Sequence, residues 1–240
     1  MTPRLALLAL LALPAAAETR SGYTDATPET RAIQDDDTTN PGFLWVQQGE
    51  TLFTQNCTAC HTATEMKGVA TRYPTYDPKK SRPLTLEQRI NECRTERQHE
   101  QAYPGESEPI LSLTAYIGLQ SRGQPMNVTA TGPAQPFLEA GEKFFNLRQG
   151  QLNLSCAQCH DALAGQSLAG SRIPQGHPNG YPLYRLEWQT IGSLTRRIRN
   201  CLTGIRATPL APDDPTLINL QLYLAARARG LSVETPAVRP

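Results

Sequence analysis

The motif Cys-x-x-Cys-His, the attachment signature for c-type haem, occurs twice in the sequence. Its members are Cys57, Cys60 and His61 in the first copy and Cys156, Cys159 and His160 in the second. In such a motif the two thiols bond to the porphyrin vinyl groups, and the histidine takes one axial position on the iron. A zinc site would have to pool ligands from motifs about a hundred residues apart, so we favour haem. The sequence therefore predicts two covalently bound haem c groups.

The second axial position on each iron has several candidate ligands. Methionine is the common choice in cytochromes c, but the sequence has none after His160. The candidates are Met66, Cys93, His99 and Met126 for the first haem, and His177 and Cys201 for the second. Cys93 and Cys201 occupy equivalent places in an internal repeat, which favours them. The predicted axial pairs are therefore His61 with Cys93 and His160 with Cys201. A disulfide between Cys93 and Cys201, or burial of both as small residues, would also account for the pair.

The charge around these two cysteines differs. Residues 193–206 contain no acidic residue and four arginines, namely Arg196, Arg197, Arg199 and Arg206. Residues 86–100 instead balance three arginines with four glutamates. Guanidinium groups hold a nearby cysteine as thiolate and attract anions, and Arg197 lies one helical turn before Cys201. The pattern favours an anion site at Cys201, with a solvated basic helix face as the alternative.

The elements that must position these residues occur twice. Residues 49–53 precede the first haem motif, and residues 141–145, of similar pattern, precede the second. The pattern Leu-x-x-Arg-Ile-x-x-Cys spans residues 86–93 and returns 108 positions later at 194–201. Its apolar residues fall on one helical face. We therefore expect an all-α fold of two tandem cytochrome c-like domains related by internal duplication, with an extended N-terminal segment.

The chain divides into predicted segments of different character. They are a signal peptide at 1–17, an N-terminal extension at 18–40, a first cytochrome c-like domain at 41–125, a polar linker at 124–136 and a second domain at 136–240. The positive start, apolar run and small residues of the first segment are typical of an export signal cleaved near Ala17, so we expect a periplasmic protein. No later stretch is long and apolar enough to span a membrane. The net charge of +1 argues against a nucleic-acid partner.

Together these features resemble the SoxA family, the dihaem c-type cytochromes of the bacterial sulfur-oxidation (Sox) system. The matching stretches are residues 34–37, 40–42 and 45–50, both haem motifs, and residues 197–201 with Gly204 and Arg206. The resemblance covers nearly all of the chain after residue 17. It rests on the combination, because the haem motifs alone are unspecific.

The resemblance implies an enzyme, an L-cysteine S-thiosulfotransferase. Such an enzyme joins thiosulfate oxidatively to a cysteine thiol of the carrier protein SoxYZ, and electrons leave through its haems to a soluble cytochrome c. The resemblance also implies a heterodimer with the monohaem cytochrome SoxX. Cys201 would be both a ligand of the second haem and the catalytic sulfur, carrying a persulfide, and Arg197 would bind the substrate. Some family members lack the first haem, but its motif is intact here. His177 and Arg206 would be helpers.

Three other functions fit parts of the sequence. A dihaem periplasmic electron carrier would want methionine or histidine on the second haem, where only His177 is available. A peroxidase-like enzyme would need an open position on the iron. A disulfide-stapled binding module would leave the haems inert.

Overall fold

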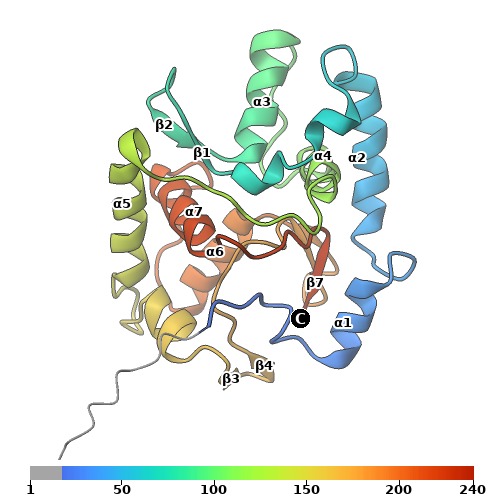
Figure 1. Cartoon of the computed structure of the whole chain (residues 1–240). Helices are drawn as coiled ribbons and strands as arrows, with labels where there is room; N and C mark the ends of the chain where they lie inside the picture. Colours follow the sequence, from blue (N-terminus) through green and yellow to red (C-terminus); the bar gives the residue numbers. More distant parts are fainter. Residues whose placement is uncertain (1–17) are drawn as a thin grey trace, which may run out of the picture.

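Helices dominate the structure, a computed structural model that describes residues 18–240. The predicted signal peptide at 1–17 lies outside the described residues. The α-helices are α1 (Pro28–Asp35), α2 (Phe43–Asn56), α3 (Leu86–Arg97), α4 (Glu108–Leu119), α5 (Gln135–Asn146), α6 (Leu194–Gly204) and α7 (Pro215–Arg227). Shorter turns are η1 (Ala63–Met66), η2 (Ala70–Arg72), η3 (Gly132–Ala134) and the π-helical η4 (Gln158–Ala162). Figure 1 shows α2 and α5 on opposite flanks, with α4 and α7 between them.

Three small sheets correct the expectation of an all-α fold. The two isolated hairpins are β1 (Thr75–Asp77) with β2 (Arg82–Leu84), and β3 (Ser167–Leu168) with β4 (Ser171–Arg172). In the third sheet, β5 (Leu183–Arg185) pairs antiparallel with β6 (Thr190–Gly192) and parallel with β7 (Ala237–Arg239). Strands of two or three residues are too short for an alternating pattern to stand out in a sequence. The fold is therefore mainly helical, with one hairpin before α3 and another before α6.

The order of elements in the first half of the chain recurs in the second. α2, the β1–β2 hairpin, α3 and α4 correspond to α5, the β5–β6 hairpin, α6 and α7. In each half the first and last helices meet at a glycine. A Cβ atom on Gly49 would lie 2.0 Å from the carbonyl oxygen of Ser112, and one on Gly141 would lie 2.1 Å from that of Asn219. Glycine at these two positions lets the two helix backbones touch, because it has no side chain to hold them apart.

Replacing Gly141 with alanine should destabilise the protein strongly. The added methyl group would meet backbone atoms rather than a flexible side chain, so α5 and α7 would have to move apart and lose buried contacts. We expect the free energy of unfolding to fall by about 3 kcal/mol, measured by chemical denaturation of the haem-loaded protein. Gly105→Ala is the control, because a Cβ atom there meets nothing within 4 Å. Equal stability of the two variants would contradict the close contact between the helices.

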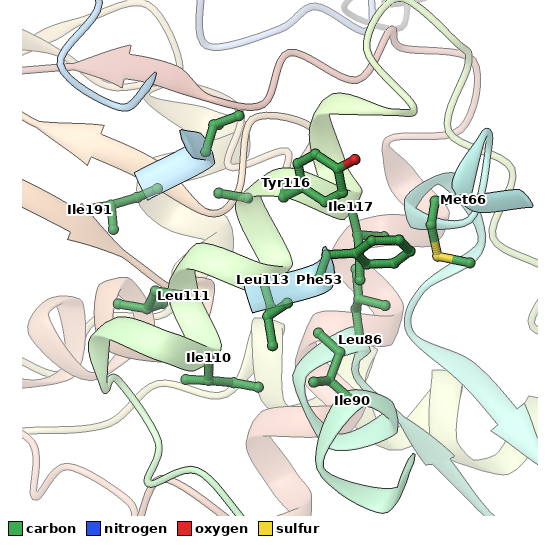
Figure 2. Packing of buried hydrophobic residues seen from close by; sticks show 12 residues of the cluster. Phe53, Met66, Leu86, Ile90, Ile110, Leu111, Leu113, Tyr116, Ile117 and Ile191 are labelled. Atoms are coloured by element: carbon green, nitrogen blue, oxygen red, sulfur yellow. The ribbon is translucent and has the colours of Figure 1, made fainter. Parts of the chain in front are cut away.

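Each half has its own apolar core, and one residue of the second half lies in the core of the first. Figure 2 shows Phe53, Leu86 and Ile90 gathered against α4, with Met66 beside the Phe53 ring. The same cluster contains Ile191 of β6, which is fully buried. The core of the second half consists of Phe145, Leu194, Ile198, Leu202, Leu217, Leu220 and Leu224. Because Ile191 lies in the first core, the two halves are packed together rather than merely joined.

The segment at 124–136 is packed against α7 and is not a free linker. Met126 and Val128 are only 5% and 2% exposed, and they belong to one cluster with residues of α7. The Met126 N–H donates to the carbonyl oxygen of Leu231 over 2.8 Å. The buried side chains of Met126, Val128 and Ala130 alternate with polar residues, as in a strand with one buried face. The polar composition of the segment therefore concealed its packed conformation.

The N-terminal extension at 18–40 holds β7 in place. The Asn40 side-chain amide donates to the carbonyl oxygen of Pro236 over 2.8 Å, and the Val238 N–H donates to Gln34 Oε1 over 3.0 Å. These contacts fix β7 beside β5, the strand that ends at Arg185. Within residues 18–240, no helix is long and apolar enough to cross a membrane.

Candidate haem and anion sites

Helix α6 places Arg197 and Cys201 inside the second half of the chain. The helix begins after Ser193, whose hydroxyl accepts a hydrogen bond from the Arg196 N–H over 3.2 Å. Glu106, from the loop before α4, accepts hydrogen bonds from the Ser193 N–H over 3.3 Å and from the Ser193 hydroxyl. Its negative charge at the start of α6 is also favoured by the helix dipole. The apolar face of α6 is buried, so the positions of Arg197 and Cys201 are fixed.

His160 faces Cys201 at the second haem motif. Its Nδ1 donates to the carbonyl oxygen of Pro174 over 2.7 Å, which leaves Nε2 for a metal. The imidazole also lies close to the Cys201 side chain. Cys156 and Cys159 lie close enough to Cys201 for their thiolate charges to interact with it. The structure thus brings together the four residues that the sequence assigns to the second haem.

The thiols of this cluster differ in acidity. Burial raises the pKa of Cys156 to about 11, and the neighbouring Cys201 adds to that shift. Burial acts on Cys201 in the same direction, yet the pKa of Cys201 lies below its ordinary value. The nearby His160 and the positive charges of Arg197 and Arg185 outweigh the burial. Cys201 therefore forms a thiolate far more readily than Cys156.

The donor set at the second motif fits haem c. Cys156 and Cys159 are free thiols at the spacing that attachment to two vinyl groups needs. An imidazole and a cysteine sulfur are both suitable axial ligands of haem iron. The effect of His160 on the Cys201 thiol places the imidazole and the sulfur at one site. These residues could therefore hold one haem, and His160 and Cys201 would be its iron ligands.

The first motif is less completely assembled. Cys57 and Cys93 lie close together, and burial with the nearby Cys93 raises the pKa of Cys57. His61 is exposed, and its charge acts on the neighbouring Glu65. Cys60 is exposed as well. The structure therefore places Cys57 beside Cys93, as a shared haem site requires, but leaves His61 at the surface.

The cysteines outside the motifs are not joined to each other. All six cysteines are free in the described chain. Cys93 groups with Cys57 in the first half, whereas Cys201 groups with Cys156 and Cys159 in the second. The structure thus does not adopt the alternative of a disulfide between Cys93 and Cys201.

The other candidate ligands of the first haem have different surroundings. Met66 lies in the apolar core beside Phe53. Met126 is buried against α7, which belongs to the second half. His99 is exposed. Met66 and Met126 are accounted for as core residues, and Cys93 stays the predicted distal ligand.

The two predicted helper residues, His177 and Arg206, have different surroundings. His177 Nε2 is 3.2 Å from Gln175 Oε1. Burial and the charge of Arg227 lower the pKa of His177 to about 4, so its imidazole is neutral at neutral pH. Arg206 is exposed, has a φ of 57° and donates its N–H to the carbonyl oxygen of Thr203 over 2.9 Å. Its backbone therefore turns the chain at the end of α6.

The electrostatic surroundings of Cys93 are the reverse of those of Cys201. Arg89 lies one turn before Cys93, as Arg197 does before Cys201. It is paired with Asp77 of β1 over 2.5 Å and with Glu92 over 2.8 Å. Burial raises the pKa of Cys93, and Glu92 counteracts the effect of Arg89. The first copy of the arginine is therefore neutralised by acids.

Arg185 is a site residue that the sequence-based prediction missed. It lies on β5, 108 positions after Asp77 of β1, so an arginine replaces the acid at the matching place in the repeat. Its positive charge acts on Cys201. Among residues 18–240, Arg197 itself makes no salt bridge. A comparison of charges at matched repeat positions, beyond the two helices, would have found Arg185.

Replacing Asp77 with asparagine tests how the first site is neutralised. The pKa of Asp77 is held below its usual 3.8 by its hydrogen bond with Arg89. The charged carboxylate therefore stabilises the fold above that pH, and the stabilisation is lost as the pH falls through the folded-state pKa. We expect Asp77→Asn to lower the unfolding temperature at pH 7, and the deficit to shrink towards pH 3. Asp37→Asn is the control, because Asp37 is 52% exposed in its pair with Arg122. A deficit that stays constant with pH would contradict the assignment.

Comparisons with known proteins agree with this geometry. The family model for the SoxA/TsdA cytochrome c domain matches residues 44–126 and again 140–233. The L-cysteine S-thiosulfotransferase subunit SoxA of Rhodovulum sulfidophilum is 36% identical over 231 residues, covering 92% of this chain and 80% of the relative. The subunit of the same name from Paracoccus pantotrophus is 33% identical over 227 residues, covering 91% and 78%. The crystal structure of SoxXA from P. pantotrophus superposes with a TM-score of 0.88 at 32% identity, covering 92% of this chain and 86% of that one.

Proposed function

Since the chain belongs to the SoxA family of haem c proteins, we propose that it performs the oxidative coupling of thiosulfate to a cysteine thiol of a carrier protein. This is the activity of an L-cysteine S-thiosulfotransferase, the name its relatives carry. The observation that carries the assignment is the position of Cys201. Its thiol lies close to His160 of the haem motif, and the charges of Arg197 and Arg185 act on it.

The reaction forms a sulfur–sulfur bond and releases two electrons. Thiosulfate and a carrier thiol, R–SH, give the thiosulfonate R–S–S–SO₃⁻, one proton and two electrons. The outer sulfur of thiosulfate bonds to the carrier sulfur, whose bond to hydrogen is broken. A site for this reaction needs a sulfur able to exchange, a means of binding a dianion and a redox centre beside both.

Cys201 is the residue we assign to sulfur transfer. Exchange at sulfur proceeds through thiolate, and its rate depends on access and on the thiolate fraction. The charges of Arg197 and Arg185 favour the thiolate of Cys201, whereas Cys156 and Cys159 would be bonded to the haem. We infer that Cys201 carries an additional sulfur as a persulfide, through which the thiosulfate sulfur can be linked to the carrier.

Arg197 is the residue we assign to substrate binding. It lies one helical turn from Cys201, and its charge reaches the Cys201 sulfur. A guanidinium binds oxyanions through parallel N–H groups, and its hydrogen bonds to a charged partner are among the strong ones. The matching Arg89 of the first half is already paired with two acids. The arginine that is free to bind an anion is therefore the one beside Cys201.

The chain is expected to hold two haem c groups. Cys57 and Cys60 would attach the first, Cys156 and Cys159 the second. The axial pairs would be His61 with Cys93 and His160 with Cys201. When bound, the haem beside Cys201 supplies a one-electron redox centre next to the reacting sulfur. The residues of this chain hold that group, orient Cys201 and keep an anion in place.

The expected partners are a second cytochrome subunit, a carrier protein and an electron acceptor, and the expected location is the periplasm. The P. pantotrophus structure that this chain resembles is a SoxXA complex, and we propose that this chain forms a heterodimer with a monohaem SoxX subunit. The carrier would be SoxYZ, and the electron acceptor a soluble cytochrome c. The apolar N-terminal run predicts export to the periplasm, where such proteins would meet.

The test is a coupling assay with the complete complex. The haem-loaded chain and its partner subunit are mixed with thiosulfate, reduced carrier protein and oxidised cytochrome c. We expect the carrier cysteine to gain one thiosulfonate for every two cytochromes reduced, measured by intact mass and absorbance. Haem content, measured as the pyridine haemochrome, should be two per chain of this protein. Cytochrome reduction without any carrier product would identify a plain electron carrier instead.

A further inference from the structure

We propose that Arg185 and Arg197 together form a clamp of two guanidinium groups for the oxyanion end of thiosulfate. The aspartate at the matching position of the first repeat, Asp77, removes this clamp there. The inference rests on the proposed function and deepens it, because it assigns a second residue that selects a dianion. It also explains why only one of two similar cysteines would be used.

The repeat places the side chains at these two positions close together. In the first half, Arg89 Nη2 lies 2.5 Å from Asp77 Oδ2. Arg185 ends β5 as Asp77 ends β1, and Arg197 occupies the place of Arg89 in the following helix. The side chain at the strand position therefore reaches the arginine one turn before the cysteine. In the second half this arrangement brings two positive charges together, and Arg197 indeed acts on Arg185 electrostatically.

The positive charges of Arg185 and Arg197 repel each other when no anion is bound. The position of Arg185 makes this repulsion costly, because its side chain is only 13% exposed. A dianion between the two arginines would offset the repulsion and satisfy their N–H groups. The arrangement is therefore what a binding site for a doubly charged oxyanion requires.

The Arg185 guanidinium has one buried N–H group without a hydrogen-bond partner in the described part of the chain. Its Nη2 donates to Glu187 over 2.9 Å, and Glu187 is 62% exposed. Its Nε is buried and has no partner among the residues described. A buried donor without a partner costs free energy. Glu187 thus satisfies one Nη2 N–H group from the exposed side, whereas the buried Nε–H group has no partner within residues 18–240 until a ligand oxygen reaches it.

The backbone around Arg185 holds it firmly. β5 lies between β6 and β7, and Arg185 pairs in register with Thr190 on one side and Arg239 on the other. The charge of Arg239 is taken up by Glu234, with which it forms a salt bridge. The guanidinium of Arg185 also lies over the Trp188 ring, 5.2 Å from its centroid. A side chain held in this way is pre-organised to bind a ligand.

The test compares Arg185→Gln, Arg185→Lys and Arg185→Asp in the haem-loaded complex with its partner subunit. Arg185→Gln should raise the KM for thiosulfate by about tenfold to a hundredfold, with a smaller change in kcat. The inhibition constant for sulfate, an inert dianion, should rise by a similar factor. Arg185→Lys should restore part of the affinity, since it keeps the charge. Arg185→Asp should have the largest effect, because the aspartate would pair with Arg197 as Asp77 pairs with Arg89.

Arg196→Gln is the matched control. Arg196 also lies over the Trp188 ring, 4.2 Å from its centroid, and it is one residue from Arg197. Arg196→Gln removes a guanidinium that packs on the Trp188 ring, but it leaves Arg185 and Arg197 unchanged. The KM for thiosulfate should therefore change less than twofold. Unfolding temperatures of all variants show that they are folded. An Arg185→Gln variant with an unchanged KM, or with a lower kcat alone, would overturn the clamp.

Direct binding separates this inference from the proposed function. Calorimetric titration of the oxidised complex with thiosulfate, without carrier, gives a dissociation constant that needs no turnover. Binding that weakens in Arg185→Gln supports the clamp even if no coupling to a carrier thiol is observed. Full coupling activity with binding independent of Arg185 would leave the proposed function in place and reject the clamp.

Discussion

A Cys201→Met variant should lose at least about a thousandfold in thiosulfate coupling and still contain two haems. Methionine supplies a sulfur ligand that haem iron accepts, so the second haem can stay six-coordinate. It has no exchangeable S–H and cannot carry a persulfide. The variant therefore removes sulfur transfer while keeping the haem in place. The loss is measured as the initial rate of thiosulfonate formation on the carrier cysteine.

Cys93→Met is the matched control for this experiment. Cys93 occupies the same place in the repeat, but its pKa is raised and its arginine is paired with acids. We expect Cys93→Met to keep most of the coupling rate, while the spectrum of the first haem changes from that of a thiolate ligand. Coupling that survives in Cys201→Met, or that disappears equally in both variants, would reject Cys201 as the sulfur carrier.

Replacing Arg197 with glutamine should raise the KM for thiosulfate by about tenfold to a hundredfold. A hydrogen bond between a guanidinium and an oxyanion acts in the bound substrate as well as in the transition state, so kcat should change less. Arg197 also lowers the pKa of Cys201. Its loss should therefore shift the acid limb of the pH–rate profile of kcat/KM upwards, since a higher pH is needed to form the thiolate.

Arg89→Gln is the control for the substitution of Arg197. It removes the equivalent arginine from a site where Asp77 and Glu92 neutralise it. The KM for thiosulfate should stay within twofold of that of the wild type, although the protein should be less stable. Equal increases in KM in the two variants would mean that thiosulfate responds to overall charge and not to a built site.

The sequence was sufficient to predict the haem chemistry and the repeat. Covalent attachment demands a fixed spacing of cysteine and histidine, so this signal survives in any fold. The family expected from the same residues is confirmed by the match of residues 44–126 and 140–233 to the SoxA/TsdA cytochrome c domain. The pattern that ends at Cys201 was strong because a helix requires apolar residues at regular spacing. In the structure this helix, α6, spans Leu194–Gly204.

Short strands and the contacts between distant segments could not be predicted in the same way. β5 has only three residues, so nothing in the sequence indicated that Arg185 acts on Cys201. The segment at 124–136 reads as polar, yet Met126 and Val128 are buried because α7 provides the surface that covers them. The exposure of His61 had no signal in the motif either. These features depend on which surfaces meet, and a local pattern does not contain that information.

The contacts made by Glu106 and Ile191 bear on how a duplicated gene keeps both of its copies. Glu106 belongs to the first copy, but it holds the start of the helix that carries Cys201. Ile191 belongs to the second copy, but it fills the interior of the first. Once such exchanges exist, neither copy can be deleted, even if one loses its original chemistry. Substitutions at the residues of the first haem can then be tolerated, while the rest of the first copy is preserved because it supports the second copy.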